Sequence, residues 1–523
     1  MASSASQGSF RFSRRSLPLV AGIIAAAATS ACTGAQAPTG TATGTASPGA
    51  GAPVGRRTLA IGATAEPPNL DATSYAAAAG AQVLLYNVYE TLVKVDAEGN
   101  LRPLLAQAWD MSQDRLTYTF ELNPAAHFSD GTPVNAAAVV ANIERVQTDE
   151  AIASRLKTVM EVVESATATD DATLEVRLKR PSILWLYEMS STPGLVINPA
   201  AFATLQTATA GSGPFTVSAW TPGDSIVLAR NADYWGTPAN FDEVTFRYIA
   251  DPNALNAALL SGQVDVISNL QAPDALAQFA DPTRFTVIEG TTNGEVVLGL
   301  NNANPALADV RVRRAIAMAI DKQALVNTVW SGKGRVLGSM SVPTDPYYED
   351  LSGVNAYDPD GARALLAEAG QTGLTLRLKP AALPYATRSA QFVASQLQAV
   401  GITTTIEEVQ FPGRWIETVY TNADYDMTIV SHVEARDLIT FANPNYYWRY
   451  HNPEFAAIVQ AADQGTTEEF VAGLKSAAEF LAQDAAAVWL FMLPNLVVTR
   501  TGITGVPQNA TTLSFDVTTM ASA

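Results

Sequence analysis

Cysteine and histidine are almost absent from this sequence. Its 523 residues include one cysteine and three histidines, none of them spaced for a shared metal ion: His127, His432 and His451. A single cysteine excludes an intramolecular disulfide framework and a zinc ribbon. A pair of histidines four positions apart, the usual helical metal-binding arrangement, is missing too. We therefore expect no metal ion and no cofactor.

Motifs for covalent and phosphate chemistry are missing as well. The sequence has no G-x-S-x-G elbow, no phosphate-binding loop that ends in Gly-Lys-Ser/Thr, and no full G-x-G-x-x-G fingerprint. The nearest glycine-rich stretch, Gly332–Gly338, is one residue too long and follows no strand, so we interpret it as a loop. We expect a protein that is not an enzyme. A secreted hydrolase remains the alternative, because a glycosidase draws its two carboxylates from distant positions.

Positive charge is scarce. The chain has 50 acidic and 32 basic residues and a formal net charge of −18. This excess would repel phosphate, so a nucleic-acid binder is not expected. With 48% hydrophobic and 16% charged residues, the chain is not disordered throughout. Its length is enough for two to four domains.

The first 31 residues have the pattern of a secretory signal peptide. Arg11, Arg14 and Arg15 precede an apolar stretch, Leu17–Ala28, and small residues follow it. The stretch is shorter than the roughly 20 residues that span a bilayer, although a retained anchor or an interfacial helix is an alternative. The run Ser13–Leu17 resembles a twin-arginine export signal, and the sequence leaves the export route open.

Cys32 follows the small residues directly, and this arrangement resembles the lipobox of bacterial lipoproteins. Thr29 stands where leucine is usual in that motif. The resemblance implies that Cys32 becomes the lipidated first residue of the mature chain; the alternative is an ordinary residue of a discarded peptide. Residues 32–56 are rich in Thr, Gly, Ala and Pro, which predicts a disordered spacer. We expect an exported protein, anchored by lipid to the outer face of the cell membrane.

The remaining sequence carries mixed helix and strand signals. Alternation of apolar residues predicts strands, and β-branched residues predict one more: 116–122, 174–178, 374–378 and 402–406. Capping residues and helical spacing predict helices: 309–320, 358–369 and 391–400. We find no internal repeat. The fold class is therefore α/β or α+β.

Four sequence blocks stand out after the spacer. The blocks are Leu104–Trp109 with Leu116–Leu122 and His127–Pro133; Gly211–Phe215 with Arg230–Gly236; Asp309–Asp321; and Tyr357–Asp360 with Leu365–Gly370 and Gln396–Ile402. They resemble the extracytoplasmic solute-binding proteins of peptide- and nickel-type ABC importers, known as solute-binding protein family 5. The blocks occur in the family's order, and the similarity extends from about residue 58 to the end. We interpret most of these residues as scaffold.

The resemblance implies an α/β fold of two lobes, the type II periplasmic-binding-protein arrangement, with a hinge between the lobes and an extra domain. The implied bounds are residues 57–95, 206–300 and 486–523 for the first lobe, 96–205 for the additional domain, and 301–485 for the second lobe. The implied function is capture of a peptide outside the membrane and its delivery to an ABC permease. Family members are mostly monomers.

The resemblance also indicates where a ligand would bind. Dipeptide and oligopeptide binders hold the ligand's amino group with an aspartate that follows a strand, and Glu434 falls on that position. The family's tryptophan is replaced by Ser431, and its Asp-Pro turn becomes Asp437-Leu438. A carboxylate is thus kept at the position, although a solvated loop residue is the alternative.

The arginine that binds the ligand's carboxylate in dipeptide binders is missing, because Leu383 precedes the Pro384-Tyr385 pair. Arg388 or Arg436 could replace it, since a guanidinium clamps a carboxylate with two hydrogen bonds. The other candidate ligand-binding residues are His432, Tyr385 and Trp415, for which surface ion pairs or core packing are the alternatives. This departure from the family pattern argues against strict dipeptide specificity.

Other functions remain open beside peptide capture. Within the family, the solute could be a nickel chelate, an opine or a sugar. Outside it, the chain could be a hydrolase anchored by the same lipid, or a co-receptor that binds solute and feeds a sensor.

Overall fold

The computed structural model describes residues 57–75 and 77–523. The signal peptide expected over residues 1–31, the lipidation expected at Cys32 and the spacer expected to residue 56 lie outside the described residues. Among the described residues, no helix combines the length and the apolar character that crossing a membrane requires.

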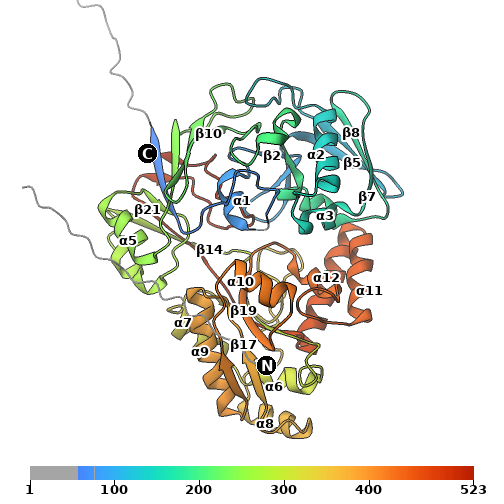
Figure 1. Ribbon diagram of the computed structural model, residues 1–523, viewed down its shortest axis with the longest axis vertical. Helices are drawn as coiled ribbons and strands as arrows, with labels where there is room; N and C mark the ends of the chain where they lie inside the picture. The colour runs from blue at the N-terminus through green and yellow to red at the C-terminus, as the bar shows by residue number, and fades with distance from the viewer. Residues whose placement is uncertain (1–56, 76) are drawn as a thin grey trace, which may run out of the picture. The chain divides into compact units, whose positions relative to one another are not determined.

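The first lobe is built on a seven-stranded sheet (Figure 1). Its central strand, β1, pairs in parallel with β12 and β13. In sheet order the strands are β10 (Phe215–Thr221), β11 (Ser225–Arg230), β12 (Glu243–Tyr248), β1 (Thr58–Ala63), β13 (Val266–Ile267), β21 (Asn495–Arg500) and β14 (Phe285–Gly290). The lobe also contains the helices α1 (Ala78–Leu84) and α5 (Pro252–Ser261) and a short pair of strands, β22 (Ile503–Thr504) and β23 (Ala521–Ser522).

The second lobe contains a six-stranded sheet. All positions of β20 and β15, two adjacent inner strands, are buried, as expected for strands covered on both faces. The sheet order is β16 (Arg335–Val336), β20 (Ala487–Met492), β15 (Glu295–Leu300), β19 (Met427–His432), β17 (Thr375–Leu378) and β18 (Thr403–Ile406). Its helices are α6 (Val310–Met318), α7 (Lys322–Val329), α8 (Pro359–Glu368), α9 (Pro384–Ala399), α10 (Gly413–Trp415), α11 (Pro453–Gln464) and α12 (Thr467–Asp484).

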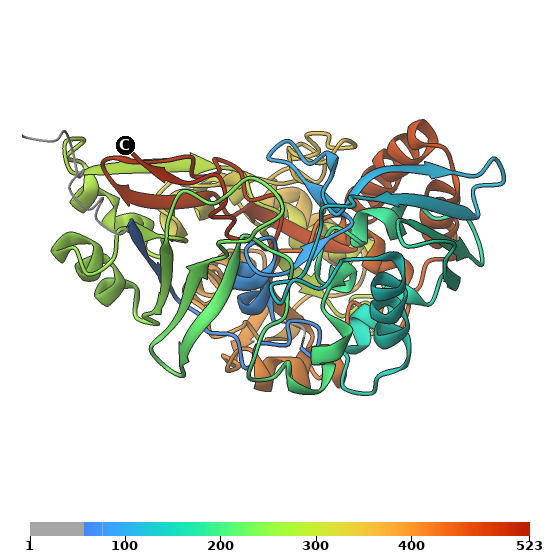
Figure 2. The same cartoon turned by 90° about the horizontal axis from the view of Figure 1, so that it is seen from above.

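The additional domain has a four-stranded antiparallel sheet and its own apolar core. Its strands are, in order, β5 (Ala106–Met111), β6 (Thr117–Leu122), β8 (Thr173–Leu178) and β7 (Val163–Ala168), and its helices are α2 (Ala136–Thr148), α3 (Ser154–Met160) and α4 (Ile183–Glu188). Short strand pairs lie beside it: β2 (Glu90–Thr91) with β9 (Leu195–Val196), and β3 (Val93–Val95) with β4 (Leu101–Pro103). Figures 1 and 2 both show this domain next to α11 and α12 of the second lobe.

The chain crosses between the two large sheets twice. It leaves the first sheet after Gly290 and enters the second at Glu295, and it returns between Met492 and Asn495. The crossing segments are held together, because Leu493 N donates to Gly294 O at 2.7 Å and Thr292 Oγ1 donates to Leu493 O at 2.6 Å. The expected bounds place β15 and β20 in the first lobe, whereas their pairing places both in the second sheet.

Most of the expected elements are confirmed. The strands expected at 116–122, 174–178, 374–378 and 402–406 correspond to β6, β8, β17 and β18. Asp358 caps α8 by accepting from Gly361 N at 2.9 Å, and Asp309 caps α6. The third expected helix, α9, begins at Pro384 rather than at Gln391, because proline suits the first turn of a helix.

Glu90 connects the two segments of one family-like block, Gly211–Phe215 and Arg230–Gly236. This carboxylate is 1% exposed and accepts hydrogen bonds from Ser212 Oγ at 2.8 Å, Tyr234 OH at 2.7 Å and Trp235 Nε1 at 3.0 Å. Burial raises the pKa of Glu90 to about 7, although these three hydrogen bonds oppose the rise. The conspicuous aromatic and glycine-serine motifs thus surround one buried carboxylate and serve the scaffold.

Candidate functional site

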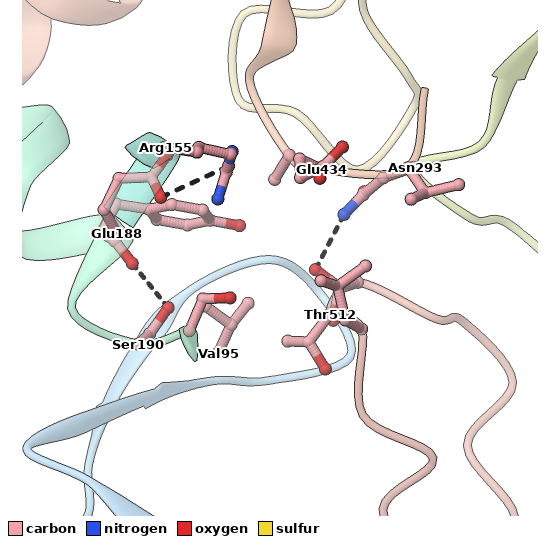
Figure 3. Close-up of a pocket in the computed structure, with 13 residues that line it drawn as sticks. Val95, Arg155, Glu188, Ser190, Asn293, Glu434 and Thr512 are labelled. Carbon is pink, nitrogen blue, oxygen red and sulfur yellow. Dashed lines mark hydrogen bonds and ion pairs between the residues drawn. The ribbon is translucent and has the colours of Figure 1, made fainter. Parts of the chain in front are cut away.

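A cavity lies where the two lobes and the additional domain meet (Figure 3). Its empty volume is about 390 Å³, part of it open to solvent. Residues from all three parts of the fold line it: Val95, Arg155, Tyr187, Glu188, Ser190, Ser191, Asn293, Val433, Glu434, Ala435, Thr511, Thr512 and Leu513. A solute in this cavity would contact every part of the fold.

The topology explains how distant segments reach this cavity. Asn293 lies in the first crossing between the sheets, and Val433–Ala435 directly follow β19. The segment Thr511–Leu513 comes from the last residues of the first lobe. Asn293 Nδ2 donates to Thr511 O at 2.9 Å, which joins the crossing to that segment.

Opposite charges line the cavity. Arg155 of α3 forms an ion pair with Glu188 of α4, with 3.6 Å between Nη2 and Oε2. Figure 3 shows this pair on one side of the cavity and Glu434 on the other. Burial lowers the pKa of the Arg155 guanidinium, but attraction to Glu188, Glu434 and Asp437 outweighs burial and raises it. The cavity thus offers a guanidinium and two carboxylates, a set that suits a solute with both an ammonium and a carboxylate.

Of the six residues expected to contact a ligand, Glu434 lines the cavity. Arg436 follows it closely but is turned onto an aromatic ring: its Cζ atom lies 3.5 Å from the ring centroid of Tyr187 and 5.1 Å from that of Phe470. The backbone of Arg436 has φ = 63°, a left-handed conformation. This cation–π stack joins the second lobe to α4.

His432 lies in an aromatic and acidic network beside the cavity. The side chain is buried, with Nδ1 at 2.9 Å from Asp437 Oδ2 and Nε2 at 2.6 Å from Tyr447 OH. Burial, followed by repulsion from Glu434, raises the pKa of Asp437. Among the described residues, His432, Glu434 and Asp437 form the group that could hold a metal ion, since their ligand atoms lie within 4.8 Å of one another.

The other three candidates lie outside the cavity lining. Tyr385 is buried, and its hydroxyl accepts from Ser431 N at 3.0 Å. Trp415 is buried as well, and its Nε1 donates to Thr428 Oγ1 at 3.1 Å. Arg388 lies 3.8 Å from Asp274 of the first lobe, measured from Nη1 to Oδ1. The structure therefore places these side chains in the core of the second lobe and at a contact between the lobes.

Two charged residues of the cavity, Arg155 and Glu188, were not anticipated from the sequence. They lie on α3 and α4 of the additional domain, far in sequence from Glu434. Neither belongs to a motif block, so no local pattern could have identified them.

Comparison with known proteins identifies related sequences. The sequence pattern of a family described as "Bacterial extracellular solute-binding proteins, family 5 Middle" matches residues 100–452. The chain is 30% identical over 294 residues to a nickel-binding periplasmic protein of Escherichia coli K12. This match covers 54% of the chain and 56% of the relative. It is 31% identical over 307 residues to the probable D,D-dipeptide-binding periplasmic protein DdpA of the same organism, covering 55% and 58%. The chain thus matches less than two thirds of the length of these curated relatives.

A solved structure matches more of the chain. The periplasmic binding protein AgaA from A. tumefacien R10, in complex with agropinic acid, superimposes with a TM-score of 0.78 at 23% identity. The match covers 89% of this chain and 99% of AgaA. The likeness shows the two-lobed fold.

Proposed function

Because the chain belongs to family 5 of the bacterial extracellular solute-binding proteins, we propose that it is the substrate-binding protein of an ABC importer. It captures a solute outside the membrane and delivers it to the permease. The cavity between the lobes carries this proposal, because its walls come from both lobes and the additional domain. A solute bound there favours the conformation in which the lobes are together, and the permease reads that conformation.

The proposed solute is a short peptide or a similar zwitterion. Arg155 and Glu434 face each other across the cavity (Figure 3). A solute carboxylate would pair with the guanidinium of Arg155, and a solute ammonium with the carboxylate of Glu434. Arg155 thereby takes the part of the arginine that the sequence lacks at Leu383.

A metal chelate is the second candidate solute. The grouping of His432, Glu434 and Asp437 favours it, and one relative is named for nickel binding. Both ring nitrogens of His432 already have partners in Asp437 and Tyr447, so a metal ion would have to replace one of these contacts. We therefore rank a chelate below a peptide.

We also propose that the protein is exported and carries lipid on Cys32, as a monomer that does no chemistry on its solute. Metabolic labelling of the producing cells with a fatty-acid probe tests the lipid, and Cys32→Ala should abolish the label. Retention of the label in that variant would contradict the assignment.

Binding itself is tested with the purified protein. Native mass spectrometry should detect solute retained in the cavity, and calorimetric titration with di- and tripeptides should give a saturable signal. Arg155→Gln and Glu434→Gln should each weaken binding, whereas Glu408→Gln, an exposed carboxylate outside the cavity, should not. If no peptide or chelate binds, or if a bound peptide is hydrolysed at a measurable rate, the proposal is wrong.

A further inference from the structure

Asp463 of α11 reaches out of the second lobe into the additional domain. Its side chain is 6% exposed and accepts three hydrogen bonds from residues around the start of α4. The donors are Arg180 Nη1 at 2.5 Å, Ser182 Oγ at 2.8 Å and Leu184 N at 3.0 Å. A buried carboxylate needs such partners, because an unpaired charge in an apolar environment is strongly unfavourable.

The helix α4 contacts the second lobe along its length. Leu184 belongs to the apolar cluster of the second lobe, and Ile183 packs against the same cluster. One turn later, the guanidinium of Arg436 stacks on the ring of Tyr187. Polar, apolar and cation–π contacts from the second lobe thus hold one short helix of the additional domain.

The same helix also forms part of the cavity. Tyr187 and Glu188 at its end line the cavity, as do Ser190 and Ser191 just beyond it. Glu188 in turn holds Arg155. The position of α4 therefore determines both where the charged wall of the cavity stands and how closely the second lobe approaches the additional domain.

We infer that Asp463 is a positioning residue that latches α4 to the second lobe when the cavity is closed. These contacts couple the second lobe to the additional domain, because the helix that makes them, α4, also lines the cavity. Separation of the lobes breaks the three hydrogen bonds of Asp463 and exposes Leu184. The inference rests on the proposed function in one respect, the opening and closing of the cavity.

The test compares the full chain with its Asp463→Asn and Asp463→Ala variants, all without added solute. We expect a larger radius of gyration by small-angle X-ray scattering in both variants. We also expect hydrogen exchange about tenfold faster or more in α4 and in Val433–Ala435, across the cavity from it. Leu184→Ala, which weakens the same contact from the other side, should produce the same changes.

Glu164→Ala is the matched control. It removes a carboxylate from an ion pair with Arg177 that lies inside the additional domain, with both side chains about half exposed, and it should leave the radius of gyration unchanged. If exchange accelerates only at the start of α4 and the radius stays constant, Asp463 merely caps a helix and the inference is overturned. Unchanged exchange in all variants would overturn it too. The scattering and exchange experiments use no solute. A failure to find a binding solute would therefore contradict the proposed function but not the role of Asp463.

Discussion

The buried carboxyl group of Glu90 makes the stability of the fold depend on pH. In the folded protein, burial raises the pKa of Glu90 from 4.5 to about 7. The folded state therefore binds the proton more tightly than the unfolded chain does. The stabilisation is fully present below pH 4.5 and is lost as the pH rises to 7. We expect Glu90→Gln, which is neutral at every pH, to remove this dependence.

The size of the effect follows from the difference between the two pKa values. A rise from 4.5 to about 7 is equivalent to about 3 kcal/mol in the free energy of unfolding. Relative to the wild type, Glu90→Gln should therefore gain up to about 3 kcal/mol between pH 4.5 and pH 8. Other buried acids also titrate in this range; burial raises the pKa of Asp345, for example, to about 6. These acids titrate in both the wild type and the variant, so their contributions to the free energy of unfolding cancel in the comparison.

Urea unfolding at pH 4.5, 6 and 8, followed by tryptophan fluorescence, measures this difference. Tyr234→Phe provides a second variant, because it removes a hydrogen bond that lowers the pKa of Glu90. The total loss of stability between pH 4.5 and pH 8 should become larger in this variant. The reasoning is refuted if the difference between Glu90→Gln and the wild type is the same at all three pH values.

Three further substitutions test the scaffold and the site. Arg145→Leu should lower the free energy of unfolding by about 3–5 kcal/mol in urea unfolding. It leaves Asp71, now paired with Arg145 at 2.6 Å, as a buried charge without an ion-pair partner, although Thr73 still donates hydrogen bonds to it. An unchanged value would show that water reaches Asp71. Gly211→Ala should lower the melting temperature in calorimetry, because the added Cβ would lie 1.9 Å from Val88 O. Such an overlap costs about 1–3 kcal/mol. An unchanged melting temperature would show that the backbone around Gly211 moves to make room for the methyl group. Glu434→Gln should weaken binding of an amine-bearing peptide by about 2–5 kcal/mol in calorimetric titration; unchanged affinity would reject Glu434 as the ammonium partner.

Local elements could be predicted from the sequence because their signals are local. The alternation in β6 buries Tyr118, Phe120 and Leu122 on one face. The cap at Asp358 and the proline that follows it mark the start of α8 within one residue. The family resemblance then supplied the two-lobed arrangement, which no single element encodes.

The crossings and the cavity could not be predicted in the same way. The strands β15 and β20 are apolar runs buried on both faces, and such runs do not reveal which sheet they join. Arg155 and Glu434 line the same cavity although they are far apart in the sequence, a long-range arrangement without a local pattern. His432 has the residue type of a ligand contact, but Tyr447 and Asp437 engage both its ring nitrogens.

The strand order of the first lobe constrains how the protein can fold as it is made. The strand β21 lies between β13 and β14, inside the sheet, although it is formed by residues 495–500. The sheet therefore has an open gap, with unpaired backbone groups on both sides, until residues 495–500 have been synthesised. Neither large sheet can be completed before this late segment is present, because β20 likewise lies inside the second sheet, between β16 and β15.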